Sequence, residues 1–342
     1  LNVRERQRAE INPMQYGTIV HYILERFFGE YTKEEYLSLE EDKFQKIVCA
    51  YLTEYAVKYF GEEQLESNSF TYRLKTILDN VMYLMKHIME ELSKSEFFVA
   101  DCELKIGEDI PSYTIVLPDG HKIAVCGSVD RVDIMQRADI TYLRIIDYKT
   151  GTKQFKLSDI LYGINLQMLL YLHSIEVSGG DKYGEIVPAG ILYMPATVPY
   201  ISSDSLKSID KLPDELNKKL KMNGLLLKDT EIIHGMDKTD VATYIPVKIK
   251  AGEPVSSTSL ATLAEFGKIF KKVDMLIAEM GKNIYNGNIE AKPLKGGHDS
   301  CEYCPYDSVC AYRQSNPITC FSVDNKTVIE EITNEINGKE EE

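Results

Sequence analysis

The chain has 342 residues, of which 44% are hydrophobic and 27% charged, and its formal net charge is −14. This composition is typical of a globular protein, and the length suits one α/β body with insertions. The acidic balance argues against non-specific binding of nucleic acid by a basic surface, without excluding a local basic groove. Since we find no apolar run of about 18 residues and no signal peptide, we expect a cytoplasmic protein without a membrane partner.

The first part of the sequence predicts helices. We expect one helix over residues 13–30 and one or two more over 33–60. Further along, hydrophobic residues recur at the i, i+3, i+4 spacing of an amphipathic helix: Leu74, Ile77, Leu78, Val81, Met85, Ile88 and Leu92. Because the chain begins at Leu1 in what resembles the middle of a domain, we expect a fragment of a longer polypeptide.

The pattern then changes to strands, separated by turn signals such as "PDG". The predicted strands cover residues 98–106, 113–117, 123–135 and 142–149. A helix is expected from Ser158, as its N-cap, to Ile175, and "PAGILYMPA" predicts a buried strand. Beyond it we expect a polar, irregular insertion with a short helix near 213–221, and then a long helix over 259–285.

The chain thus divides into five parts. They are a helical part over 1–95, a core sheet with its following helix over 96–200, an insertion over 201–257, a long helix with a cysteine-rich segment over 258–322, and an acidic tail over 323–342. The first four would form one domain, and the tail would be solvated or frayed. "KGGHDS" lacks the spacing of a phosphate-binding loop, so we expect no ATP-driven motor in this chain.

The stretch "AVCGSVDRVDIMQRADITYLRIIDYKTG" predicts a hairpin that turns around Ala138 and Asp139. In antiparallel pairing about that turn, partner numbers sum to 277, so Asp133 faces Arg144 and Asp130 faces Asp147. The first pair is a favourable cross-strand ion pair and supports this register.

The second pair sets two carboxylates opposite each other, with Cβ atoms about 5 Å apart, which is destabilising unless a cation lies between them. Side chains alternate along a strand, so Lys149 shares the face of Asp130 and Asp147, whereas Asp133 lies on the other face and is not expected to bind a metal. Two aspartates and a lysine on one face suit Mg²⁺-assisted phosphodiester hydrolysis. The alternative is that two acids at strand ends align by chance.

Two helical segments carry further polar residues. In "GTIVHYILE", Gly17, His21 and Glu25 lie four residues apart and share a helix face. In "NLQMLLYLH", Gln167 and Tyr171 have the same spacing. Taken alone, each pattern is more typical of packing than of function.

Together these motifs resemble the RecB-like branch of the PD-(D/E)xK nuclease superfamily. The matching segments are "GTIVHYILE", "GSVDRVD", the "DYK" of "IIDYKTG", and "QMLLY", and their order and spacing agree with the family. The resemblance implies an α/β fold with a restriction-endonuclease-like core: a central mixed β-sheet flanked by helices, with helical additions. It also implies that Gln167 and Tyr171 fill the family's Q-x-x-x-Y motif, which supports the site and DNA contact.

The same resemblance implies the roles of the charged residues. His21, Asp130 and Asp147 would bind a divalent metal ion, Mg²⁺, together with the main-chain carbonyl of Tyr148. Lys149 would be the catalytic lysine.

A narrower resemblance is to the C-terminal nuclease domain of AddB subunits of AddAB-type helicase–nucleases. It rests on "LNVRERQRAEINPMQYGTIVHYILE" and "KMNGLLLKDTEIIHGMD", and covers nearly the whole chain except the acidic tail. It implies a DNA exonuclease of double-strand-break repair by homologous recombination that cuts the 5′-ended strand. Its partners would be DNA and, in a heterodimer, an AddA-type helicase–nuclease subunit, and the helicase-like remainder would precede Leu1.

The segment "CEYCPYDSVC" spaces Cys301, Cys304 and Cys310 as a metal or cluster site does. Three ligands are one short, and the local candidates for a fourth are His298, which would complete a zinc-type set, and Cys320. The family resemblance implies a different answer, in which a cysteine upstream of Leu1 completes a [4Fe–4S] cluster in the full-length protein and this fragment can lack it. The remaining cysteines, Cys49, Cys102 and Cys126, are expected to be buried and structural.

Three functions are therefore open from the sequence. The leading one is a Mg²⁺-dependent DNA exonuclease domain. The second is a catalytically inactive scaffold that binds DNA ends, against which the intact set of Asp130, Asp147 and Lys149 argues. The third is a zinc-stabilised interaction module built on the cysteines.

Overall fold

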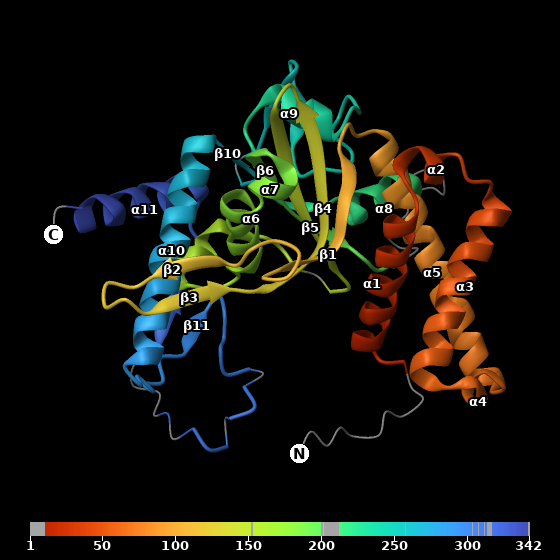
Figure 1. Ribbon diagram of the computed structural model, residues 1–342, viewed down its shortest axis with the longest axis horizontal. Helices are drawn as coiled ribbons and strands as arrows, with labels where there is room; N and C mark the ends of the chain where they lie inside the picture. Colours follow the sequence, from red (N-terminus) through yellow and green to blue (C-terminus); the bar gives the residue numbers. More distant parts are fainter. Residues whose placement is uncertain are drawn as a thin grey trace.

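In the part of the chain that the structure describes, the centre of the molecule is a six-stranded mixed β-sheet with helices on both sides (Figure 1). The computed structural model describes residues 11–151, 153–199, 201, 212–256, 258–302, 304–306, 308–310, 312 and 317–340. The sheet strands are β1 (Phe98–Ile106), β4 (Gly127–Arg137), β5 (Ile140–Lys149), β6 (Glu185–Pro195), β7 (Asn223–Leu227) and β10 (Leu260–Ala261), in the order β1–β4–β5–β6–β7–β10. β5 pairs with β6, and β7 with β10, in parallel, and the other neighbours are antiparallel. The predicted fold class is confirmed.

Two groups of helices cover the sheet. The first group precedes β1 and comprises α1 (Pro13–Glu30), α2 (Lys33–Leu37), α3 (Glu41–Phe60), α4 (Glu62–Leu65) and α5 (Asn68–Ser93). The later helices are the 3₁₀ helix η1 (Leu157–Tyr162), α6 (Gln167–Ser178), α7 (Gly180–Tyr183), α8 (Leu212–Leu220), α9 (Thr230–Met236), α10 (Leu263–Tyr285) and α11 (Asn325–Glu340). None of the described helices is long and apolar enough to cross a membrane.

Three two-stranded ribbons complete the described structure. They are β2 (Tyr113–Val116) with β3 (Lys122–Val125), β8 (Lys248–Lys250) with β9 (Glu253–Val255), and β11 (Leu294–Gly296) with β12 (Ile318–Cys320). The single strand predicted over 123–135 is thus divided into β3 and β4 at Cys126.

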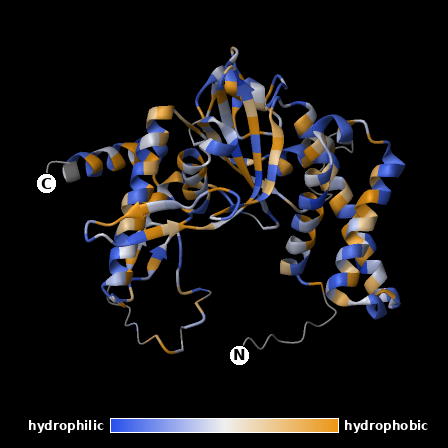
Figure 2. Cartoon of the chain, viewed as in Figure 1, coloured by the Kyte–Doolittle hydropathy of each residue, from blue (hydrophilic) through white to orange (hydrophobic). Residues whose placement is uncertain are grey.

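The β4–β5 hairpin has the predicted register. Its pairs run from Arg131 with Ile146 to Arg137 with Ile140, so partner numbers sum to 277 throughout. At the turn, Ala138 adopts a left-handed conformation with φ of 49°. In Figure 2 these strands carry orange segments between blue ones. Val132, Ile145 and Ile146 of the hairpin are fully buried because both faces of the sheet are covered.

The helix predicted over 158–175 is interrupted. Residues 157–162 form η1, and α6 begins only at Gln167. Gly163 and Asn165 both adopt positive φ, 68° and 55°, which a continuous helix cannot accommodate. Ser158 is buried inside η1 rather than acting as an N-cap.

The segment predicted as an irregular insertion contributes to the core. It supplies the expected short helix, α8, but also β7, whose Leu225 and Leu226 are fully buried in the sheet. In α9, Ile233 is likewise fully buried. The short apolar segment 223–227 is therefore a strand of the central sheet, although the sequence on either side of it is polar.

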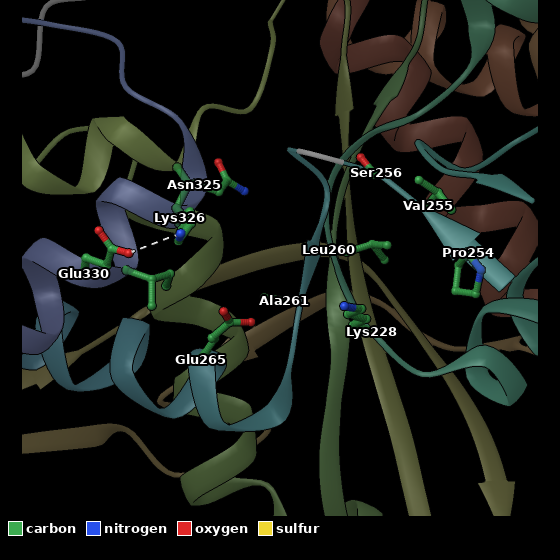
Figure 3. Close-up of a pocket in the computed structure, with 12 residues that line it drawn as sticks. Lys228, Pro254, Val255, Ser256, Leu260, Ala261, Glu265, Asn325, Lys326 and Glu330 are labelled. Carbon is green, nitrogen blue, oxygen red and sulfur yellow. Dashed lines mark ion pairs between the residues drawn. The ribbon is translucent and has the colours of Figure 1, made fainter. Parts of the chain in front are cut away.

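The tail expected to be solvated forms α11, and that expectation is wrong for most of its length. Its Val328, Ile332 and Ile336 are buried against the core, and Glu335 pairs with the buried Lys272 of α10 at 2.5 Å. A cavity of about 550 Å³ lies between the starts of α10 and α11 and strands β9 and β10, and none of the predicted site residues lines it (Figure 3).

Two of the cysteines expected to be buried are exposed. Cys49 lies on the outer face of α3, next to the buried Val48, and Cys126 lies at the break between β3 and β4. Cys102 on β1 is half-buried, and burial raises the pKa of its thiol to about 12.

Candidate active site

Asp130 occupies the end of the β4–β5 hairpin. One of its carboxylate oxygens accepts a hydrogen bond of 2.8 Å from the main-chain N–H of Tyr148, which fixes the side chain to the neighbouring strand. Burial raises the pKa of Asp130 to about 6; His21 opposes this shift, and the negative charge of Asp147 adds to it. The carboxylate is thus buried near the negative charge of Asp147, an environment that favours a bound cation.

His21 reaches Asp130 from the helix α1. The helix starts with a capping box, in which Asn12 and Gln15 each bind the other's main-chain N–H. Nδ1 of His21 lies 3.4 Å from a carboxylate oxygen of Glu103 and 3.6 Å from one of Asp130. Burial acts to lower the pKa of His21, but the hydrogen bond with Glu103 and the charges of both carboxylates outweigh it, so the pKa is raised.

Glu103 is a site residue that the sequence motifs did not reveal. It belongs to β1, and the flanking pairs in the β1–β4 register place it across from Asp130. Its backbone is left-handed, with φ of 50°, a strained conformation in a strand. The hydrogen bond with His21 lowers its carboxyl pKa, and Ser128 donates to its second oxygen at 2.8 Å.

His21, Glu103 and Asp130 offer ligand atoms that all lie within 4.8 Å of one another, and they are the one such group of three among the described residues. One imidazole nitrogen with two carboxylates is a donor set that fits a divalent cation. The Tyr148 main chain lies beside this group, because it donates its N–H to Asp130 and raises the pKa of His21. We refer to these three residues as the acidic cluster.

Asp147 and Lys149 form a second pair at the same end of the hairpin. Asp147 is buried, Lys149 is about 30% exposed, and Nζ lies 2.5 Å from a carboxylate oxygen of Asp147. Of the predicted metal ligands, the structure therefore brings His21 and Asp130 together, whereas Asp147 pairs with Lys149.

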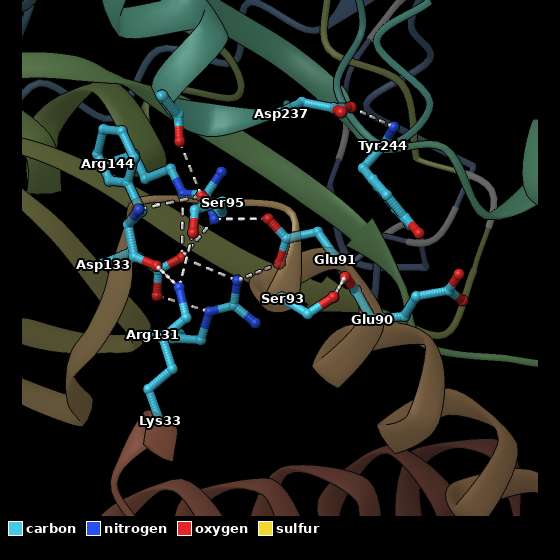
Figure 4. A network of polar contacts seen from close by, with 12 residues as sticks. Lys33, Glu90, Glu91, Ser93, Ser95, Arg131, Asp133, Arg144, Asp237 and Tyr244 are labelled. Atoms are coloured by element: carbon cyan, nitrogen blue, oxygen red, sulfur yellow. Dashed lines mark hydrogen bonds and ion pairs between the residues drawn. The ribbon is translucent and has the colours of Figure 1, made fainter. Parts of the chain in front are cut away.

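On the opposite face of the hairpin lies a fully buried charge network (Figure 4). Asp133 accepts hydrogen bonds from Arg131 at 2.8 Å and Arg144 at 3.0 Å, and Glu91 of α5 accepts one from Arg144 at 2.7 Å. The predicted pair of Asp133 and Arg144 is confirmed, and so is its separation from the acidic cluster. Arg131 also donates to the hydroxyl of Tyr148 at 3.2 Å, which ties the network to the strand of the candidate site.

The helix α6 packs its polar residues against the start of β4. Nε2 of Gln167 lies 3.5 Å from the hydroxyl of Tyr171. A Cβ added at Gly127 would lie 2.1 Å from that hydroxyl, so only glycine at this position lets Tyr171 approach the strand. The predicted pair thus reaches the strand that carries Asp130, three residues before it.

The other residues of the α1 motif also face the site. An added Cβ at Gly17 would lie 3.6 Å from the side chain of Thr150, which follows Lys149. Burial raises the pKa of Glu25, and the charge of Glu103 raises it further.

The cysteine-rich segment is described only in part. Cys301 and Cys304 are half-buried, Cys310 is exposed, and none forms a disulfide. In the described residues these three cysteines do not form a compact ligand group with each other, with His298 or with Cys320. Their role as cluster ligands stays a prediction.

The chain matches the PD-(D/E)XK nuclease superfamily over residues 1–311, and it belongs to that superfamily. The fold and the polar residues at the hairpin end agree with this membership.

The relatives are considerably longer proteins, and each is named as the B subunit of an ATP-dependent helicase/deoxyribonuclease. The chain is 34% identical over 324 residues to the protein of Thermoanaerobacter sp. (strain X514). The matched region covers 91% of this chain and 28% of that relative. It is 32% identical to the protein of Alkaliphilus oremlandii, over 98% of this chain and 30% of the relative. For the Clostridium kluyveri protein the identity is 33%, over 100% of this chain and 31% of the relative. The chain thus spans less than a third of the length of the curated relatives it matches.

Proposed function

We propose that this chain is the nuclease domain of a helicase–nuclease subunit, and that it hydrolyses DNA phosphodiester bonds as a Mg²⁺-dependent exonuclease. One observation supports the proposal most strongly: the acidic cluster lies at the same end of the β4–β5 hairpin as Asp147 and Lys149. It occurs in a chain that belongs to a nuclease superfamily.

We assign the residues of the site two different roles. His21, Glu103 and Asp130 would hold the divalent cation, with the carbonyl of Tyr148 beside them. The cation would neutralise charge that develops on the phosphate and lower the pKa of a water molecule. Lys149, held by Asp147, would orient that water or stabilise the developing negative charge.

The wider role is supported by the names of the relatives, which are helicase/deoxyribonuclease subunits. We infer that the full-length protein pairs with an AddA-type subunit in the cytoplasm, cuts the 5′-ended strand, and acts in double-strand-break repair. We further infer that Cys301, Cys304 and Cys310 bind a [4Fe–4S] cluster there, with a fourth ligand from a preceding segment.

The test is cleavage of single- and double-stranded DNA labelled at either the 5′ or the 3′ end. We expect cutting in Mg²⁺, none in EDTA, and a loss of about 10²- to 10³-fold in rate for Lys149→Ala. A Lys149→Ala protein that cuts as fast as the wild type would refute the assigned site. Binding of DNA ends without cutting, in protein purified with its cluster intact, would instead support the inactive scaffold.

A further inference from the structure

A second lysine, Lys153, lies close to the candidate catalytic lysine. The ring of Tyr193 lies near both: Nζ of Lys149 is 5.8 Å and Nζ of Lys153 is 5.0 Å from the ring centroid. The two ammonium groups are therefore no more than the sum of these distances, 10.8 Å, apart. Tyr193 is buried on β6 and pairs with Asp147 of β5, so its ring lies on the sheet face of the candidate site.

The main chain at Lys153 is fixed to the sheet. The side-chain amide of Asn223, at the start of β7, donates to the carbonyl of Lys153 at 3.1 Å and accepts from the N–H of Phe155 at 2.7 Å. Asn223 itself pairs with Tyr193 across β6 and β7. One amide thus holds the segment that carries Lys153 beside the ring.

The two lysines differ in their charge partners. Lys149 is paired with Asp147, whereas in the described part of the chain Lys153 has no carboxylate within 4.0 Å. Burial lowers the pKa of Lys153 and the positive charge of Lys149 lowers it further, whereas the negative charges of Asp147 and Asp159 oppose this shift. Lys153 thus lacks the close carboxylate that Lys149 has, and an anion bound at its ammonium group would supply the missing charge partner.

We propose that Lys153 binds a backbone phosphate of the DNA strand, the one next to the phosphate that is cut. The inference rests on the proposed function, which brings the scissile phosphate to Lys149. An ammonium group supplies three donors and a compact charge, which suits a phosphate oxygen. Because the chain carries a net charge of −14, contacts of this kind must come from local cations rather than from the whole surface.

The test is binding of a fluorescein-labelled single-stranded oligonucleotide, followed by anisotropy in EDTA so that the strand stays intact. We expect Lys153→Gln to raise Kd about 10-fold, as loss of one charge-assisted contact does, and Lys153→Arg to restore most of the affinity. The slope of log Kd against log salt should fall by about 0.7 for Lys153→Gln, the value for one lost phosphate contact on a single strand.

Lys156→Gln is the matched control, because Lys156 is exposed, belongs to the same segment, and loses the same charge. It should change Kd less than about twofold, as expected for a screened surface charge. Equal melting temperatures of the variants and the wild type establish that the fold is intact.

The outcomes separate this inference from the proposed function. If the wild type binds and cuts DNA but Lys153→Gln binds as tightly with the same salt slope, the role of Lys153 is refuted and the nuclease stands. If Lys153→Gln binds DNA weakly although the wild type does not cut, the phosphate contact of Lys153 is supported and the proposed exonuclease activity is refuted. Absence of binding by the wild type in EDTA would overturn the phosphate contact, and cleavage in Mg²⁺ would still decide the proposed function.

Discussion

At the scale of single residues, Asp130 makes the metal-free protein sensitive to pH. Its pKa is about 6 in the folded protein, against an ordinary value of 3.8, mainly because the carboxyl group is buried. Between these two values the folded state binds more protons than the unfolded state, so the free energy of unfolding falls as the pH rises through this window. Above pH 6 the buried, ionised carboxylate lowers the free energy of unfolding. A bound cation would raise it again.

We therefore predict that Asp130→Asn stabilises the metal-free protein at pH 8, by about 1–3 kcal/mol. Asparagine keeps an oxygen to accept the hydrogen bond from Tyr148 but carries no charge. The gain should shrink as the pH falls from 6 to 4, and Mg²⁺ should stabilise the wild type more than the variant. Thermal melting in EDTA and in Mg²⁺ measures both effects; an equal gain at pH 4 and pH 8 would exclude the buried charge as its cause.

Most of the candidate site could be predicted from the residues, but Glu103 could not. His21, Asp130, Asp147 and Lys149 belong to motifs with recognisable spacing. Glu103 faces Asp130 only because of the β1–β4 register, which shifts between Val99 and Asp101, and because its own backbone is left-handed. A local pattern contains neither piece of information.

At the scale of elements, the hairpin is braced by the buried network of Arg131, Asp133, Arg144 and Glu91. Its two cations and two anions balance, and every member is at most 1% exposed. Removing one charge leaves an uncompensated ion in the interior, which is far more costly than losing a surface ion pair.

We predict that Asp133→Asn lowers the free energy of unfolding by about 3–5 kcal/mol. The matched control is Asp139→Asn at the exposed turn of the same hairpin, which should change it by less than about 0.5 kcal/mol. Urea denaturation of the three proteins gives the comparison. Equal stability of both variants would mean that the network does not brace the hairpin.

The regular elements followed from hydrophobic periodicity and turn signals, and so did the hairpin register. The error over 158–175 has a local cause that composition conceals. Gly163 and Asn165 divide the segment because each adopts a positive φ, and an isolated glycine inside a helical pattern does not by itself predict such a break.

At the scale of the whole molecule, the C-terminal segment is part of the core. Its acidic composition suggested a solvated tail, yet α11 buries three aliphatic side chains and pairs with α10. Strand β7 similarly joins the sheet from a segment whose composition is largely polar. In both cases long-range packing decides the structure, and a short sequence window does not contain it.

We predict that Ile332→Ala lowers the free energy of unfolding by about 2–5 kcal/mol, because the side chain is fully buried. Glu331→Ala, on the exposed face of the same helix, should have an effect below about 0.5 kcal/mol. A tail that is solvated would instead make both substitutions neutral in a denaturation experiment.

We propose that His21, Glu103 and Asp130, whose ligand atoms lie within 4.8 Å of one another, bind a divalent metal at the end of the β4–β5 hairpin. Isothermal titration of Mg²⁺ into the wild type, Glu103→Gln and Asp130→Asn at pH 8 tests it most directly. We expect binding by the wild type and an affinity at least about 10-fold weaker for each variant, since each loses one charged oxygen ligand. Mg²⁺ affinities that are unchanged in both variants would contradict it.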